Sequence, residues 1–136
     1  MGISWVDEKG RAGRDGSRVV TMNARLISLI EIDGRRFAHD VVVEGGVVRR
    51  RKKGPSKPYR TKDGHTPLSP DEAIPWSASR LIVGTGASGQ LPMTPELFDE
   101  ARRRGVEITA EPTEVACRLL QEADPGKVSA VLHVTC

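Results

Sequence analysis

The stretch RLIVGTG, residues 80–86, decides the fold of this 136-residue chain. Its first four residues predict a strand, which ends at Gly84. The nearly all-apolar run at residues 128–134 predicts the last strand of the chain, and the shorter run at residues 106–110 predicts a strand between them. The other predicted elements are placed relative to these three strands.

Two helices are predicted between these strands. Thr94-Pro95-Glu96 is typical of a helix start, and Gly105 is typical of its end. Residues 112–123 predict a second helix with apolar side chains on one face, ended by Asp124-Pro125-Gly126. The order β-α-β-α-β normally gives parallel strands joined by right-handed crossovers.

The N-terminal half predicts a meander that follows a flexible leader. Residues 1–24 are predicted to be a flexible leader, because residues 9–17 are polar, rich in glycine and without periodicity, and Met22 could be the original start. Ordered structure is expected from about Leu26 to the C-terminus as one domain, residues 25–136. Strands are predicted at residues 27–32, 37–43 and 47–51. Asp33-Gly34 favours a two-residue hairpin turn between the first two strands.

A long loop at residues 54–67 is predicted to separate the meander from the β-α-β-α-β half. After it, Ser69 as a cap, Pro70 in the first turn and Glu72 reaching back predict a short helix that Pro75 stops. The fold class is therefore α/β, with an N-terminal β-meander followed by β-α-β-α-β.

Composition narrows the class of protein. Hydrophobic residues make up 38% and charged residues 29%, as in a globular domain. No apolar run reaches the roughly 20 residues that span a membrane, and the N-terminus has no apolar signal-peptide core. Two cysteines, Cys117 and Cys136, do not make a disulfide framework, which favours the cytoplasm. Cys117 beside the apolar helix stripe is expected to have a packing role.

The glycine stretch at residues 84–89 matches G-x-G-x-x-G, the pattern of dinucleotide-binding turns, and Glu111 lies where a ribose-binding acid would follow. However, Pro92 and Pro95 delay the next helix to about Thr94, so its N-terminus would not face a pyrophosphate. A tight turn that needs glycine is one alternative, and a small-ligand or anion pocket built from backbone N–H groups is another.

The candidate site lies where the predicted parallel strands end, because ligands of open α/β sheets gather at the carboxyl edge. A small polar pocket is expected there, and His65 could cover it from the long loop. The residues expected to line it are Gly84, Thr85, Gly86, Thr113, His133 and Thr135.

An enzymatic alternative uses the C-terminal thiol. Cys136 could act as a nucleophile with His133 or His65 as its base. The opposing interpretation is an inert terminal thiol beside a buried histidine. A metal site would need a third ligand, and the spacing of His65, His133 and Cys136 is not diagnostic, so neither a metal nor a cofactor is predicted.

The basic stretch at residues 49–62 contains eight lysines and arginines and no acid, within a net charge of +3. It could contact phosphate backbones, but only Tyr59 is available for stacking and no nucleic-acid motif is present. A solvated loop beside a charged strand edge is the favoured interpretation.

Several segments in this order resemble a known family. They are Ile32-Asp33-Gly34, His39-Asp40-Val41, Gly64-His65-Thr66-Pro67, the stretch at residues 81–86, Gly105-Val106-Glu107-Ile108, the stretch at residues 111–116 and His133-Val134-Thr135-Cys136. The chain resembles, over residues 26–136, the small α/β domain family of adipogenesis-associated and methanogen hypothetical proteins. A mitochondrial complex I assembly factor is a distant branch of that family.

The resemblance implies a three-layer α/β fold with a mixed central sheet and an extra β-layer, and it carries over no catalytic activity. Leu119-Leu120 stands where relatives often have Tyr-Asn, so a partner surface there is in doubt. We therefore expect a non-enzymatic binding or assembly-factor-like domain, monomeric or weakly self-associating, with an unknown protein partner or a small polar or anionic ligand.

Overall fold

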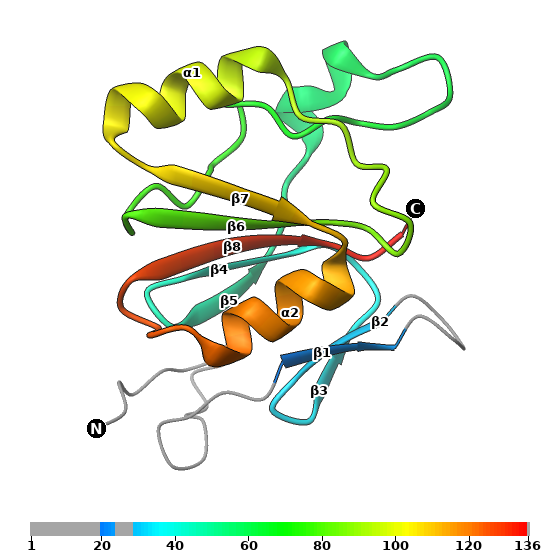
Figure 1. The fold of residues 1–136 in the computed structure, drawn as a ribbon. Helices are drawn as coiled ribbons and strands as arrows, with labels where there is room; N and C mark the ends of the chain where they lie inside the picture. The colour runs from blue at the N-terminus through cyan, green and yellow to red at the C-terminus, as the bar shows by residue number, and fades with distance from the viewer. Residues whose placement is uncertain (1–19, 24–28, 136) are drawn as a thin grey trace.

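The computed structural model describes residues 20–23 and 29–135, which form two sheets and two α-helices (Figure 1). The larger sheet has the order β5-β4-β8-β6-β7. Strands β6, β7 and β8 are parallel, whereas β4 is antiparallel to both β5 and β8, so the sheet is mixed, as expected. Its strands are β4 (Val41–Glu44), β5 (Val47–Arg50), β6 (Arg80–Thr85), β7 (Glu107–Glu111) and β8 (Val128–His133).

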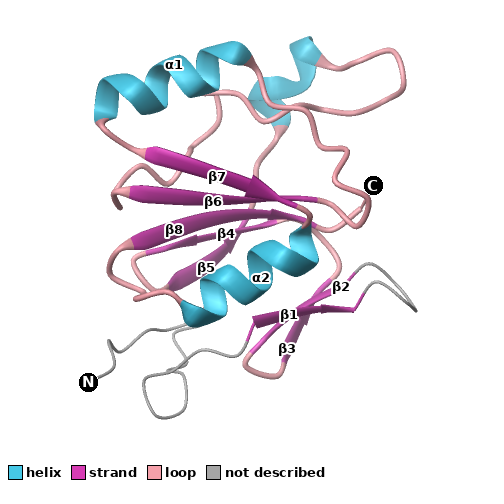
Figure 2. Cartoon of the chain, viewed as in Figure 1, coloured by secondary structure: helices cyan, strands magenta, loops and turns pink. Residues whose placement is uncertain are grey.

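The helices α1 (Pro95–Arg104) and α2 (Thr113–Glu122) lie on opposite faces of this sheet (Figure 2). This follows from the strand order, because β7 and β8 flank β6 on opposite sides and right-handed crossovers then run in opposite directions. Helix α1 begins late, as predicted: the Thr94 hydroxyl accepts the Leu97 N–H at 3.3 Å, and Gly105 ends the helix with φ 68°.

The smaller sheet is antiparallel and packs on the same side as α2. It contains β1 (Val20–Asn23), β2 (Leu29–Ile32) and β3 (Arg35–Phe37). The hairpin turn at Asp33-Gly34 is confirmed, with φ 50° and 84°, the positive values that this two-residue turn requires. The prediction that order begins near Leu26 is wrong, because β1 pairs with β2 and buries Val20. Residues 1–19 of the predicted leader lie outside the described residues.

The predicted strand at residues 37–43 is wrong, since it is two strands in different sheets. Residues 38–40 belong to neither strand and connect β3 to β4. The Asp40 carbonyl accepts the Arg51 N–H at 3.0 Å, and the Asp40 carboxylate accepts the Val134 N–H at 3.0 Å. Asp40 is therefore held by the larger sheet, which redirects the chain after Phe37.

The predicted helix at Ser69 is also wrong. One turn forms, in which the Glu72 N–H donates to the Ser69 carbonyl at 3.3 Å. The Glu72 side chain does not return to Ser69 but pairs with Arg51, and Pro75 has no N–H with which to continue a helix. A 3₁₀ helix, η2 (Gly54–Tyr59), lies instead within the segment predicted to be a loop.

The core has two apolar layers, because successive residues of each strand face opposite sides of the sheet. Val41, Val43, Ile82 and Leu132 face α2 and the smaller sheet, where Cys117 is also buried. Val42, Leu81, Val83 and Val131 face the other side, where Leu97 and Ala101 of α1 pack. Because both faces are covered, β6 and β8 have the continuous apolar sequence that singled them out.

Gly84 lets β6 and the start of α2 approach closely. A β-carbon there would lie 2.8 Å from the Thr113 hydroxyl oxygen and 3.1 Å from the Thr113 α-carbon. No side chain larger than hydrogen fits without moving the helix.

We expect Gly84→Ala to lower the free energy of unfolding by about 1–3 kcal/mol through overpacking. The matched control is Gly54→Ala, since a β-carbon at Gly54 meets no heavy atom within 4 Å. Urea unfolding followed by circular dichroism compares the two variants. Equal stabilities would contradict the close approach of β6 and α2.

Candidate functional site

A cavity of about 240 Å³ lies at the carboxyl edge of the larger sheet, near the end of β8. Figure 1 shows the described chain ending at this edge. Seven of the nine residues that line the cavity have polar or charged side chains. The lining consists of Ala38, His39, Asp40, Arg50, Arg51, Lys53, His133, Val134 and Thr135.

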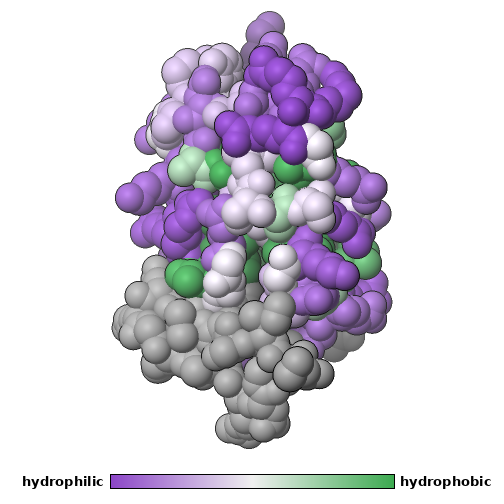
Figure 3. Space-filling view, turned by 90° about the vertical axis from the view of Figure 1, so that its left-hand side faces the viewer, coloured by the Kyte–Doolittle hydropathy of each residue, from purple (hydrophilic) through white to green (hydrophobic). Residues whose placement is uncertain are grey.

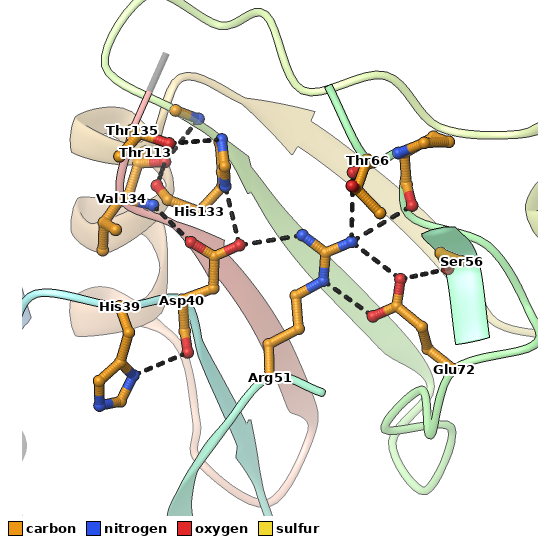
Figure 4. A network of polar contacts seen from close by, with 12 residues as sticks. His39, Asp40, Arg51, Ser56, Thr66, Glu72, Thr113, His133, Val134 and Thr135 are labelled. Atoms are coloured by element: carbon orange, nitrogen blue, oxygen red, sulfur yellow. Dashed lines mark hydrogen bonds and ion pairs between the residues drawn. The ribbon is translucent and has the colours of Figure 1, made fainter. Parts of the chain in front are cut away.

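Arg51 is the most buried cation of the wall, with 2% of its side chain exposed. It follows β5 and points across to the 54–79 segment, where Nε and Nη2 donate to the two Glu72 carboxylate oxygens, both at 2.8 Å (Figure 4). Nη1 donates to Asp40 Oδ2 at 2.9 Å, and Nη2 also reaches the Pro67 carbonyl at 3.2 Å. Burial alone would lower the pKa of Arg51, but Glu72 and Asp40 raise it, so the guanidinium stays charged.

Glu72 is fully engaged on its other side. Its Oε2 also accepts a hydrogen bond from the Ser56 hydroxyl, which lies 2.7 Å from the Ser69 hydroxyl. Ser56 belongs to η2, and Ser69 precedes the turn that carries Glu72. The buried carboxylate therefore joins η2, the Ser69 turn and the end of β5 through one guanidinium.

Asp40 links Arg51 to the end of β8. Its Oδ1 accepts the Val134 N–H at 3.0 Å, and its Oδ2 lies 2.8 Å from His133 Nδ1 (Figure 4). Burial alone would raise the pKa of Asp40. The hydrogen bond and charge of His133, the Val134 N–H and the charge of Arg51 outweigh burial and lower this pKa from 3.8 to about 2.

The His133 ring has a defined orientation and a defined tautomer. The ionised Asp40 carboxylate can only accept, so His133 Nδ1 must carry a proton. In the neutral ring, Nε2 is then an acceptor, and it lies 3.2 Å from the Thr135 hydroxyl oxygen. The order carboxylate, imidazole, hydroxyl runs from the buried network to the surface, where Thr135 is exposed.

Thr113 supports His133 from behind the cavity wall. Its hydroxyl accepts the Gly86 N–H at 2.7 Å and donates to the His133 carbonyl at 2.6 Å, while its own N–H donates to the Gly86 carbonyl at 3.0 Å. These bonds join the ends of β6 and β8 to the first residue of α2. Gly86 has φ 105°, which explains the need for glycine in this turn.

The structure brings together only part of the predicted site. His133 and Thr135 line the cavity, whereas Gly84, Thr85, Gly86 and Thr113 are not among its lining residues. Gly84, Thr85 and Thr113 are buried.

His65 is not among the lining residues either, and its Nε2 lies 3.5 Å from Asp63 Oδ2. Cys136 lies outside the described residues, so its role stays a prediction. The described residues contain no group of three or more histidine, cysteine, aspartate or glutamate side chains that could hold a metal. None of the helices in the described ranges is long and apolar enough to cross a membrane.

Asp40, Arg51 and Glu72 are site residues that sequence reasoning missed. Arg51 was grouped with its exposed basic neighbours, and Glu72 was given a capping role. The sequence gives little indication of this cluster, because the three residues are separated by 11 and 21 positions and come together only when the sheet has formed. A carboxylate directly before the buried run Val41–Val43 is the one local hint that Asp40 is buried for a polar partner.

The basic stretch does not form one surface. Arg51 is buried, and Arg49 donates to the Ala73 carbonyl at 2.9 Å and lies 3.7 Å from Glu44. Arg50 and Lys53 are exposed and line the cavity. Within the described residues, neither of these two cations has an ion-pair partner. Nucleic-acid binding by residues 49–62, the less favoured alternative, stays untested.

A second group of cations lies at the opposite end of the molecule. Figure 3 shows hydrophilic side chains gathered there over the C-terminal end of α1. These arginines are paired within the helix: Arg102 with Asp99, and Arg103 and Arg104 with Glu100. Arg50 and Lys53 at the cavity differ from them, because neither forms an ion pair with another described residue.

Comparisons with solved structures show the fold in other proteins. The conserved hypothetical protein PH1505 from Pyrococcus horikoshii OT3 is 31% identical with a TM-score of 0.71, over 85% of this chain and 99% of that one. A protein described as MT938 is 20% identical with a TM-score of 0.62, over 86% and 99% of the two chains. A Mth938-like domain protein from Bordetella pertussis is 24% identical with a TM-score of 0.52, over 85% and 86%. No protein-family model and no curated protein matches the chain.

Removing the central cation should be costly. We expect Arg51→Met to lower the free energy of unfolding by about 3–5 kcal/mol, because it leaves buried Glu72 and Asp40 without their counter-charge. Arg50→Met, on the adjacent exposed residue, is the control and should change stability by less than about 0.5 kcal/mol. Urea unfolding measures both, and a similar small effect of the two would contradict the buried network.

The low pKa of Asp40 gives stability a defined pH dependence. The folded-state value of about 2 lies below the ordinary 3.8, so Asp40 contributes about 2 kcal/mol above pH 4. That contribution is lost as the pH falls through 3.8 towards 2. Urea midpoints from about pH 5 to about pH 2 should fall less steeply for Asp40→Asn than for the wild type. Parallel pH profiles would show that Asp40 titrates normally.

Proposed function

We propose that this chain, which belongs to the same family as the conserved hypothetical protein PH1505, is a small binding domain that takes an oxyanion in the cavity at the carboxyl edge of its sheet. One observation carries the proposal: Arg50 and Lys53 line this cavity without an ion-pair partner among the described residues. Neighbouring Arg51 is held away by two carboxylates and cannot serve as a third cation.

The charge balance of the wall favours an anion. Asp40 is the only carboxylate in the described lining. Both its oxygens already accept hydrogen bonds, from Val134, Arg51 and His133. Arg51 is the counter-charge of both Asp40 and Glu72, so this buried group keeps one net negative charge. The two positive charges of Arg50 and Lys53 outweigh it and leave the cavity with a net positive charge.

Size and place fit a small ligand. A volume of about 240 Å³ is below the usual range of roughly 300–1,000 Å³ for drug-sized ligands, and it suits a phosphate or carboxylate group with a short substituent. The cavity also lies at the carboxyl ends of β5 and β8, and ligands of open α/β folds usually bind at this edge of the sheet. The Gly86–Thr113 contacts support the wall without contacting the ligand.

Two finer parts of the proposal rest on other observations. A cytoplasmic location rests on cysteine usage, since the two cysteines of the chain do not make a disulfide framework. Cys117 itself is buried in the core, and burial, with a smaller effect of the Glu114 charge, raises its pKa to about 12, so its role is packing. An assembly-factor-like role, and membership of the adipogenesis-associated branch, rest on the sequence resemblance alone.

Titration of the ¹⁵N-labelled chain with inorganic phosphate, at constant ionic strength, tests the binding function. Saturable shifts should be confined to amides around the cavity, and Lys53→Met should weaken binding roughly tenfold, since a hydrogen bond to a charged group contributes about 1.5 kcal/mol. The control is Lys57→Met, an exposed cation outside the lining that removes the same charge. Equal weakening by the two variants, or no saturable shifts, would sink the proposal.

A further inference from the structure

The row formed by Asp40, His133 and Thr135 has the geometry of an activated hydroxyl. His133 Nδ1 lies 2.8 Å from Asp40 Oδ2, and His133 Nε2 lies 3.2 Å from the Thr135 hydroxyl oxygen (Figure 4). A base within such reach of a hydroxyl, and itself oriented by a carboxylate, is the general arrangement for nucleophilic catalysis. Thr135 is exposed while His133 and Asp40 are largely buried, so the hydroxyl is the end of the row that a substrate can reach.

Asp40 and His133 are held in place by contacts that do not involve a ligand. Asp40 is fixed by Arg51 and the Val134 N–H, and the His133 main chain is fixed by the Thr113 hydroxyl. Glu72 in turn fixes Arg51. Such a pre-organised arrangement costs little reorganisation when a reaction takes place.

We propose that Thr135 is the nucleophile of an acyl-transfer reaction on small anionic acyl donors of the acyl phosphate class. The proposal rests on the proposed oxyanion site, because Arg50 and Lys53 would hold the phosphate beside Thr135. His133 is the general base, and Asp40 is a positioning residue that keeps the proton on His133 Nδ1.

The reaction balances without a further reagent. The Thr135 hydroxyl oxygen forms a bond to the carbonyl carbon while His133 Nε2 takes its proton. The bond from that carbon to the phosphate oxygen breaks, its electron pair leaves with the phosphate, and His133 returns the proton to it. Water then attacks the acyl ester with His133 as base, and the products are the carboxylate, a proton and the restored Thr135 hydroxyl.

The two exposed cations of the lining have two roles in the proposed reaction. Arg50 and Lys53 stabilise the leaving phosphate and the oxyanion that develops on the carbonyl oxygen. A neutral acyl ester lacks the first of these contacts. We therefore expect acetyl phosphate to acylate the chain much faster than p-nitrophenyl acetate relative to their rates with free threonine.

Mass spectrometry of the full chain after incubation with acetyl phosphate tests the proposal. Peptide mapping should place one acetyl group on Thr135, and hydroxylamine should remove it, as it removes esters but not lysine amides. Thr135→Val should abolish this label and reduce enzyme-dependent phosphate release by roughly 100-fold or more, whereas Thr135→Ser should retain both. Thr21→Val, at an exposed position of β1, is the matched control and should behave as the wild type.

Asp40→Asn distinguishes a role of Asp40 in positioning the His133 proton from a purely structural role. An asparagine amide can donate to Nδ1, so ¹⁵N spectra should show the imidazole proton moved to Nε2, with labelling of Thr135 reduced at the same time. The same spectra report whether the variant is folded. Retained labelling with the proton on Nε2 would overturn the role of Asp40 and of the base.

The other possible outcomes also test the nucleophile and the oxyanion site. Hydroxylamine-resistant acetyl groups on lysines alone, or a labile label that Cys136→Ser removes and Thr135→Val leaves, would overturn Thr135 as the nucleophile. Phosphate binding without acylation overturns this inference and leaves the binding function standing. Acylation of Thr135 without saturable phosphate binding overturns the oxyanion site instead.

Discussion

The buried guanidinium of Arg51 is the constraint on which the site depends. A buried cation is tolerated only when its donors are satisfied by anions and carbonyls, and this one takes two carboxylates and backbone oxygens from separate parts of the chain. Through it the 54–79 segment is fixed against the end of β5, and Asp40 is fixed at the start of β4. These contacts offset the cost of burying the charge, and they hold the irregular 54–79 segment against the sheet.

The polar network continues from the buried charges to the surface at the end of β8. Strand β8 lies between β4 and β6, so His133 lies beside Asp40 on one side and beside the end of β6 on the other. Thr113 contributes from the start of α2 and holds the His133 carbonyl. The same hydrogen bonds that complete the secondary structure therefore orient the imidazole, and the proposed binding and acyl-transfer roles use an arrangement that the fold already needs.

Charge distribution separates this edge from the rest of the surface. The arginines of α1 have carboxylates one turn away and form ion pairs within the helix. Such exposed pairs contribute little to the stability of the fold. Arg50 and Lys53 come from a segment without acids. Of its other cations, Arg51 pairs with Glu72 in the interior and Arg49 lies 3.7 Å from Glu44. The exposed positive charge at the cavity follows from this local absence of acids.

Periodicity and turn chemistry in the sequence determined the parallel strands, the late start of α1 at Thr94 and the hairpin at Asp33-Gly34. These features depend on neighbours a few residues away: alternation or helical spacing, a cap, and glycine at positive φ. The order of the predicted strands also places His133 and Thr135 at the carboxyl edge of the sheet, where both line the cavity. Only the tertiary structure decided that Glu72 pairs with Arg51 instead of capping a helix, and that Asp40 reaches across 93 positions to His133. Those contacts join residues distant in sequence, and the burial that makes them favourable exists only once the sheet has formed.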